Sequence, residues 1–120
     1  MNFLLGLLLG VTVATTLRKG GKGLTPAQFA DAIALRDYDY ILDVRTPDEW
    51  KQGHHPAAKL MPIGTFVTDL PATIKNKNAR ILLYCKRGIR AEAATQIAHR
   101  LGYDNVRYLD GTYDELSRLK

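Results

Sequence analysis

Short apolar runs alternate along the chain with segments whose apolar residues recur at helical spacing. The runs with the composition of strands are 40–44, 59–62, 80–84 and 106–109. The segments with the spacing of helices are 26–36, a short one from Pro47, 66–74, 91–101 and 113–119. Strands that alternate with helices, and that are apolar almost throughout, are typical of a parallel sheet covered on both faces. The pattern therefore predicts an α/β fold.

Local signals mark the ends of several predicted helices. Thr25-Pro26-Ala27-Gln28 and Thr46-Pro47-Asp48-Glu49 both have the form of a capping box with proline at the first helical position. Gly102 is placed to end the helix over 91–101. Ligands of parallel sheets bind beyond the carboxyl ends of the strands, where Asp43-Val44-Arg45 and Cys85 both fall. We therefore expect these two segments to meet.

The first 17 residues have no charged side chain and are set apart from the rest of the chain. As a hydrophobic helix they would reach about 25 Å, a little less than the ~30 Å hydrocarbon core of a bilayer. Arg18, Lys19 and Lys22 follow the apolar run, and no basic side chain precedes it. By the positive-inside rule, residues 3–17 are predicted to form a single-pass membrane anchor with the folded part in the cytoplasm.

A cleaved signal segment is the alternative, because Thr12 and Ala14 form a weak small-x-small cleavage pattern. The mature protein would then be periplasmic or secreted. Gly6 and Gly10 make a GxxxG motif that could support a weak dimer through the anchors. The expected organisation is thus an anchor or signal over 1–17, a linker over 18–23 and one globular domain over 24–120.

Composition limits the function to one small fold with one thiol. The chain has 120 residues, enough for a single domain. Cys85 is the only cysteine, so an internal disulfide and a four-cysteine zinc site are both excluded. The formal net charge of +5 is modest and gives no indication of nucleic-acid binding. Any functional role of Cys85 would therefore depend on the chemical reactivity of its thiol.

The segment Cys85-Lys86-Arg87-Gly88-Ile89-Arg90 is the strongest candidate for chemistry. It forms a tight turn between a buried strand and a helix, where successive N–H groups and the free amides of the helix N-terminus can surround the sulfur. Lys86, Arg87 and Arg90 add three positive charges. Such surroundings favour the thiolate, although a lone cysteine can also be a buried packing residue.

Four motifs, taken in order, resemble those of the rhodanese domain, and the resemblance covers roughly residues 24–117. They are Asp43-Val44-Arg45 with Asp48-Glu49-Trp50, Gly53-His54-His55-Pro56-Ala57-Ala58, the loop Cys85 to Arg90, and Leu109-Asp110-Gly111. The family writes these as D-V-R-x-x-x-E-[FWY], G-H-I-P-G-A, C-x-x-G-x-R and L-x-G-G. The sequence departs from the family pattern at His55, at Ala57 and in the ending after Gly111. The active loop matches the family pattern.

The resemblance implies a five-stranded parallel sheet flanked by helices on both faces, and a sulfurtransferase that needs no cofactor. Cys85 would accept a sulfane sulfur from a small anionic donor such as thiosulfate, as a persulfide, and pass it to a thiol or cyanide. Lys86, Arg87, Gly88, Ile89 and Arg90 would bind the donor, although Arg90 could instead only brace the loop. Asp43, Arg45 and Glu49 are expected to support the site, with an ion pair between Arg45 and Glu49.

Three other hypotheses are compatible with some of these residues. His54 and His55 could suggest a metal site, but they lack a cysteine or carboxylate partner at ligand spacing, so turn packing is the expected role. A phosphatase or arsenate reductase would use a C-x5-R loop, and here Arg90 falls one position earlier. A membrane-tethered binding module on the same scaffold, without turnover, is the non-enzymatic alternative.

Overall fold

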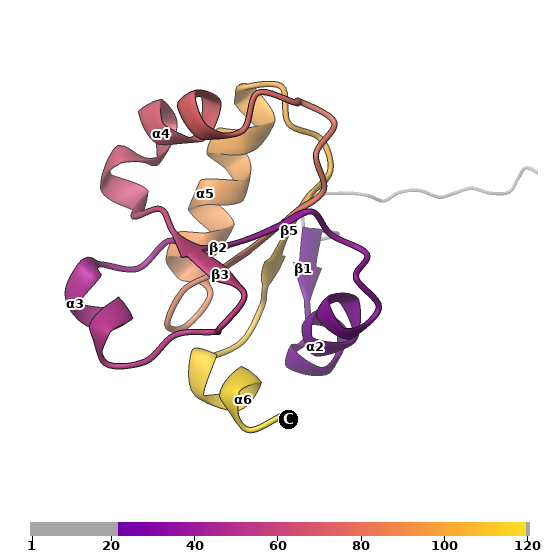
Figure 1. Cartoon of the computed structure of the whole chain (residues 1–120), viewed down its shortest axis with the longest axis vertical. Helices are drawn as coiled ribbons and strands as arrows, with labels where there is room; N and C mark the ends of the chain where they lie inside the picture. Colours follow the sequence, from indigo (N-terminus) through magenta and orange to yellow (C-terminus); the bar gives the residue numbers. More distant parts are fainter. Residues whose placement is uncertain (1–21, 120) are drawn as a thin grey trace, which may run out of the picture.

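The computed structural model of the chain describes residues 22–119 and contains one five-stranded, fully parallel sheet (Figure 1). The strand order is β1-β5-β4-β2-β3. The strands are β1 (Gly23–Leu24), β2 (Tyr40–Asp43), β3 (Ala58–Leu60), β4 (Ile81–Tyr84) and β5 (Val106–Leu109). The predicted α/β fold with a five-stranded parallel sheet is therefore confirmed.

Helices cover both faces of this sheet, as expected. They are α2 (Pro26–Ala34), α3 (Pro47–Lys51), α4 (Phe66–Thr73), α5 (Ile89–Arg100) and α6 (Tyr113–Ser117), with a 3-10 turn, η3 (Ile63–Thr65), before α4. In Figure 1, α4 and α5 lie on one side of the sheet and α2 and α6 on the other. The capping boxes at Thr25 and Thr46 are both formed. A third one, at Thr112 with Glu115, opens α6 and was not predicted.

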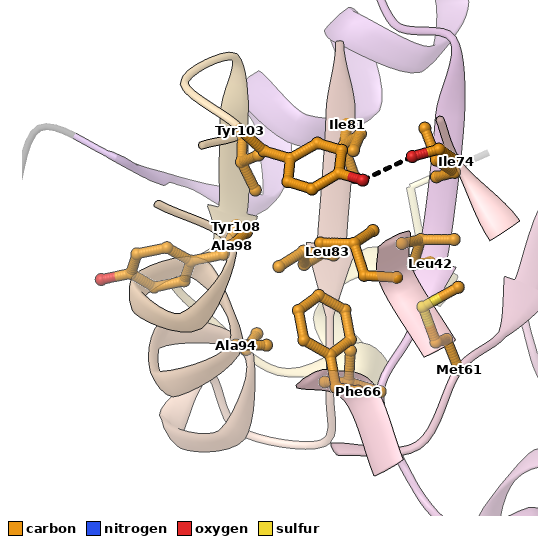
Figure 2. Close-up of a cluster of buried hydrophobic side chains, with 14 of the residues drawn as sticks. Leu42, Met61, Phe66, Ile74, Ile81, Leu83, Ala94, Ala98, Tyr103 and Tyr108 are labelled. Carbon is orange, nitrogen blue, oxygen red and sulfur yellow. Dashed lines mark hydrogen bonds between the residues drawn. The ribbon is translucent and has the colours of Figure 1, made fainter. Parts of the chain in front are cut away.

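The central strand β4 is apolar throughout because its two faces contact different helices. Ile81 and Leu83 belong to the core on the α4 and α5 side, and Leu82 and Tyr84 belong to the core on the α2 and α6 side. Successive side chains of a strand point to opposite faces, so a strand buried on both sides alternates between two cores. Figure 2 shows Ile81 and Leu83 among the side chains of the first core.

That first core also fixes the connection between α4 and β4. The buried phenol of Tyr103 donates a hydrogen bond to the carbonyl oxygen of Ile74, the residue that follows α4 (Figure 2). A buried hydroxyl needs such a partner to offset its desolvation. Burial raises the pKa of Tyr103 above its ordinary value, because ionisation would place an uncompensated charge in the core.

The N-terminal region differs in detail from the sequence prediction. Strand β1 contains Gly23, the last residue of the predicted linker, and pairs Gly23 with Tyr108 and Leu24 with Leu109 of β5. A two-residue strand is too short for a hydrophobic pattern to reveal. The predicted hydrophobic helix over 1–17, and with it the anchor and the anchor-mediated dimer, lies outside the described residues. Within residues 22–119, no helix is long and apolar enough to cross a membrane.

Candidate active site

The carboxyl ends of β2 and β4 lie side by side and bring the two predicted segments together. Asp43 pairs with Tyr84 in the sheet, and the next amide, Val44 N–H, donates to the Tyr84 carbonyl at 3.0 Å. The chain leaves β4 at Cys85 and enters α5 at Ile89. The expected meeting of Asp43-Val44-Arg45 with Cys85 is therefore confirmed.

The sulfur of Cys85 lies in a cradle of backbone amides. Its Sγ accepts hydrogen bonds from Gly88 N–H at 3.1 Å and from Ala91 N–H at 3.3 Å. The residue is only 1% exposed. Amides at the start of α5 carry partial positive charge that no helical carbonyl satisfies, so they stabilise a negative charge on the sulfur. The predicted cradle is present, and Ala91 belongs to it although it lies outside the six-residue loop.

Gly88 allows the loop to turn tightly enough to form this cradle. Its φ of +100° is a left-handed conformation that side chains rarely adopt. A Cβ at this position would lie 3.3 Å from the carbonyl oxygen of Leu109. Gly88 thus packs against the backbone after β5, while its N–H points at the sulfur.

A cavity of about 230 Å³ opens above the cradle. Its lining consists of loop residues, namely Cys85, Lys86, Arg87, Ile89 and Arg90. Lys86 and Arg87 are exposed, and Ile89 is 76% exposed. Hence five of the six predicted loop residues face this cavity, and the sixth, Gly88, shapes the turn beneath it. The cavity combines a nucleophilic sulfur with cationic walls, which suits a small anion.

Arg90 is held in place by Glu49 of α3. Its two terminal nitrogens donate to the two carboxylate oxygens of Glu49 at 2.7 and 2.9 Å. Chiefly through these hydrogen bonds, Arg90 lowers the pKa of Glu49 from its ordinary value to about 2. A bidentate pair of this kind is both strong and directional. Arg90 therefore braces the active loop against α3 as well as lining the cavity.

The expected ion pair between Arg45 and Glu49 is not formed, and that prediction was wrong. The Arg45 guanidinium instead pairs with Asp43, with Nη2 at 2.7 Å from Oδ2 and Nε at 2.9 Å from Oδ1. Arg45 Nη2 also donates to the Gly53 carbonyl at 2.7 Å. Both partners are buried, Asp43 completely. A buried carboxylate needs a charged partner, and Arg45 is the one within reach, since Glu49 faces Arg90.

Arg45 further supports two tyrosines beneath the active loop. Its guanidinium carbon lies 4.5 Å from the ring centre of Tyr113 and 5.5 Å from that of Tyr84. The two rings stack at 5.4 Å. Tyr113 N–H, at the start of α6, donates to the carbonyl of Lys86 at 3.0 Å. The start of this helix at Tyr113 agrees with the sequence prediction, but its contact with the active loop was not predicted, because no local pattern indicates a partner 27 positions away.

The two adjacent histidines, His54 and His55, form packing and hydrogen-bond contacts in and around the turn after α3. His54 stacks on Trp50 with ring centres 3.4 Å apart, and its Nδ1 lies 2.8 Å from the Trp50 carbonyl oxygen. His55 accepts a hydrogen bond at Nδ1 from Ala57 N–H, and its own N–H donates to the Tyr84 hydroxyl oxygen. Across the part of the chain that the structure describes, no group of three or more His, Cys, Asp or Glu side chains could hold a metal ion.

Comparison with known proteins gives one family and one fold. The family model of the rhodanese-like domain matches residues 25–119. The human single-domain sulfurtransferase TSTD1 superposes with a TM-score of 0.70 at 22% identity, covering 82% of this chain and 97% of that one. The thiosulfate sulfurtransferase of Pseudomonas aeruginosa superposes with a TM-score of 0.69 at 27% identity, covering 80% of this chain and 18% of that one.

Curated relatives are much longer than this chain. A protein of Erwinia tasmaniensis named tRNA uridine(34) hydroxylase is 33% identical over 82 residues, which are 65% of this chain and 23% of the relative. The chain spans about a quarter to a third of the curated relatives of this name that it matches. In those relatives, the matched region is therefore only one part of a longer protein.

Proposed function

Because the chain belongs to the rhodanese-like domain family, we propose that it is a sulfurtransferase in which Cys85 carries the transferred sulfur as a persulfide. The donor is a small anion such as thiosulfate, and the acceptor is a thiol or cyanide. The observation that carries the proposal is the Cys85 sulfur, which accepts hydrogen bonds from Gly88 N–H and Ala91 N–H at the base of a cationic cavity. These amides stabilise both the attacking thiolate and the persulfide formed from it.

The chemistry proceeds in two displacements at sulfur. The Cys85 thiolate attacks the outer sulfur of thiosulfate, a new S–S bond forms, and the bond to the sulfonate sulfur breaks so that sulfite leaves with the electron pair. The acceptor then attacks the outer sulfur of the persulfide, and Cys85 leaves again as a thiolate. Cys85 begins and ends this cycle as a thiolate, so no general base is needed at Cys85, and an acceptor thiol reacts as its thiolate after it has released its proton to water. Lys86 and Arg87 attract the anionic donor through their field.

The contacts of Arg90 argue against a phosphatase or an arsenate reductase. A phosphatase loop needs an arginine whose two terminal nitrogens bind the oxyanion. Here Arg90 Nη1 and Nη2 both donate to Glu49. The C-x4-R loop is also one residue shorter than C-x5-R, and its Gly88 and Ala91 amides converge on the sulfur itself. This arrangement suits a single sulfur atom better than a tetrahedral oxyanion.

A scaffold that only binds a partner would have no use for such a nucleophile, so the non-enzymatic alternative is less well supported. Hydroxylation of tRNA is named for relatives of which this chain matches a quarter to a third, and we do not extend it to this chain. We keep as a proposal that residues 3–17 anchor the domain to a membrane with the catalytic part in the cytoplasm.

Mass spectrometry of the intact protein after incubation with thiosulfate tests the proposed function. The expected result is one added sulfur, located on the peptide that contains Cys85 and removed by subsequent incubation with cyanide. A Cys85→Ser variant treated in parallel controls for sulfur bound elsewhere. Absence of the adduct in the wild-type protein, with thiosulfate left unconsumed, would exclude the persulfide mechanism.

A further inference from the structure

A second polar cavity, of about 200 Å³, adjoins the one above Cys85. Its lining comes from the segment after β2, from α3 and the turn that follows it, from the active loop and from α6: Arg45, Glu49, Gln52, Gly53, Lys86, Tyr113 and Asp114. Lys86 lines both cavities. The ion pair described above lies at the boundary, because Arg90 lines the first cavity and Glu49 lines the second.

Most charges in this second cavity are already neutralised by the protein itself. Arg45 is paired with Asp43 at 2.7 Å, and Glu49 is paired with Arg90 at 2.7 Å. Lys86 and Asp114 remain, and neither forms an ion pair within residues 22–119. One free positive and one free negative side chain therefore lie on the lining of the same small cavity.

The size and charge of the cavity select a class of ligand. A volume of about 200 Å³ lies below the roughly 300–1,000 Å³ of pockets for drug-sized molecules and suits a molecule no larger than a single amino acid. A ligand with one carboxylate and one ammonium group would match Lys86 and Asp114, respectively. A purely anionic ligand would leave Asp114 unmatched and repelled.

We propose that this cavity is the acceptor subsite of the sulfur-transfer reaction, and that it takes a small thiol with an α-ammonium and an α-carboxylate group, of which cysteine is the simplest. The inference rests on the proposed function. The carboxylate contacts Lys86 and the ammonium contacts Asp114, while the thiol extends across the boundary toward Cys85. The Tyr113 ring, whose centre lies 4.5 Å from the Arg45 guanidinium carbon, forms part of the cavity wall.

The order of the two displacements makes Lys86 available for both substrates. Sulfite leaves the first cavity before the acceptor enters, so the cation that attracts the donor is free when the acceptor binds. The acceptor thiolate then attacks the outer sulfur of the persulfide. A bond forms between these two sulfurs, the bond to Cys85 Sγ breaks, and its electron pair returns to Cys85 as the thiolate. The product is the persulfide of the acceptor, and no outside oxidant or reductant is needed.

Three acceptors that differ only in their charged groups test this subsite. L-cysteine has both groups, cysteamine has only the ammonium, and 3-mercaptopropionate has only the carboxylate. The kcat/KM of each acceptor is measured with the wild-type protein and with Asp114→Asn. Each acceptor is compared with itself across the two proteins, so differences in thiol pKa between acceptors cancel.

We expect Asp114→Asn to lower kcat/KM for L-cysteine and cysteamine by about fivefold to tenfold, the size of one charge-assisted hydrogen bond at a partly exposed site. The value for 3-mercaptopropionate should stay the same or rise. Asp114→Lys should extend this trend and favour 3-mercaptopropionate over cysteamine. Asp31→Asn, the same change at an exposed position on α2, should shift all three acceptors equally or not at all.

Equal effects of Asp114→Asn on all three acceptors, or no effect on any, would overturn the acceptor subsite. Persulfide formation from thiosulfate is followed by mass in the same wild-type preparation. If Cys85 gains sulfur but the acceptors show no such selectivity, only the subsite is wrong. If Cys85 gains no sulfur, the proposed function fails and the subsite fails with it.

Discussion

Glu49 and Arg90, separated by 41 positions in the chain, form a two-pronged ion pair at 2.7 and 2.9 Å that connects α3 to the first turn of α5. The pair fixes the end of the active loop opposite Cys85. It is partly exposed, with 25% of the Glu49 side chain and 32% of the Arg90 side chain accessible. Partial exposure should therefore reduce what the pair contributes to overall stability.

Glu49→Gln tests this pair through pH. The pKa of Glu49 is lowered to about 2, so below its ordinary value of about 4.5 the unfolded chain binds more protons than the folded one. The stability that the pair contributes is fully present above pH ~4.5 and is lost as the pH falls toward ~2. Allowing for partial exposure, we expect about 1–2 kcal/mol. For Glu49→Gln, urea unfolding at neutral pH should give a free energy of unfolding that is lower than that of the wild-type protein by this amount. As the pH falls from ~4.5 toward ~2, the free energy of unfolding of the variant should decrease less than that of the wild-type protein.

Glu115→Gln is the matched control for Glu49→Gln, because Glu115 occupies the same position in the capping box of α6 and, within residues 22–119, forms no ion pair with an arginine. It should leave the rate of persulfide formation close to that of the wild-type protein, whereas Glu49→Gln should lower it severalfold. Equal rates in the two variants would show that the ion pair does not position the loop.

Cys85→Ser should abolish sulfur transfer from thiosulfate to cyanide. A serine hydroxyl stays protonated at neutral pH and is a poor nucleophile toward sulfur, although it is nearly the same size. The fold should survive, as checked by circular dichroism and thermal unfolding. Thiocyanate production above about a tenth of the wild-type rate, with the fold intact, would rule out Cys85 as the sulfur carrier.

Replacing Lys86 and Arg87 by alanine should raise the KM for thiosulfate and weaken its dependence on ionic strength. Both side chains are exposed at the mouth of the cavity and act through a field that salt screens over about 10 Å at 0.1 M. The measurement is the steady-state KM from low to high salt. A salt profile identical to that of the wild-type protein would contradict the assigned role.

Gly88→Ala should distort the cradle and destabilise the domain by about 1–3 kcal/mol, the cost typical of a side chain forced into a left-handed backbone. The new Cβ would also approach the Leu109 carbonyl to 3.3 Å. Urea unfolding and the rate of persulfide formation should both respond. Gly64→Ala is the control, because its Cβ would meet no atom within 4 Å, and it should change stability by no more than about 0.5 kcal/mol.

Deleting residues 1–20 should leave a soluble, folded domain with full activity, because every strand and helix of the described fold begins at or after Gly23. The full-length protein should sediment with membranes, and protease added outside intact cells should not digest the domain. Digestion from outside, or a mature N-terminus near Thr15, would favour the exported form over the cytoplasmic anchor.

The sequence alone was sufficient for those features that depend on neighbours within a few positions. The capping boxes at Thr25 and Thr46 need only residues three apart, and the cradle of Cys85 needs only a turn, a glycine and the start of a helix. The alternation of apolar strands and helices also predicted the parallel sheet. These signals depend on residues that are close together in the sequence, so they can be recognised without knowing the three-dimensional structure.

Tertiary structure decided which charged and aromatic groups became partners. Glu49 is four positions from Arg45, yet it pairs with Arg90, because α3 and the start of α5 meet at one edge of the sheet while Asp43 already holds Arg45 in the core. The contact of Tyr113 with the Lys86 carbonyl arises in the same way. A charge takes the partner that burial and the packing of distant elements place within reach, and spacing along the chain does not contain that information.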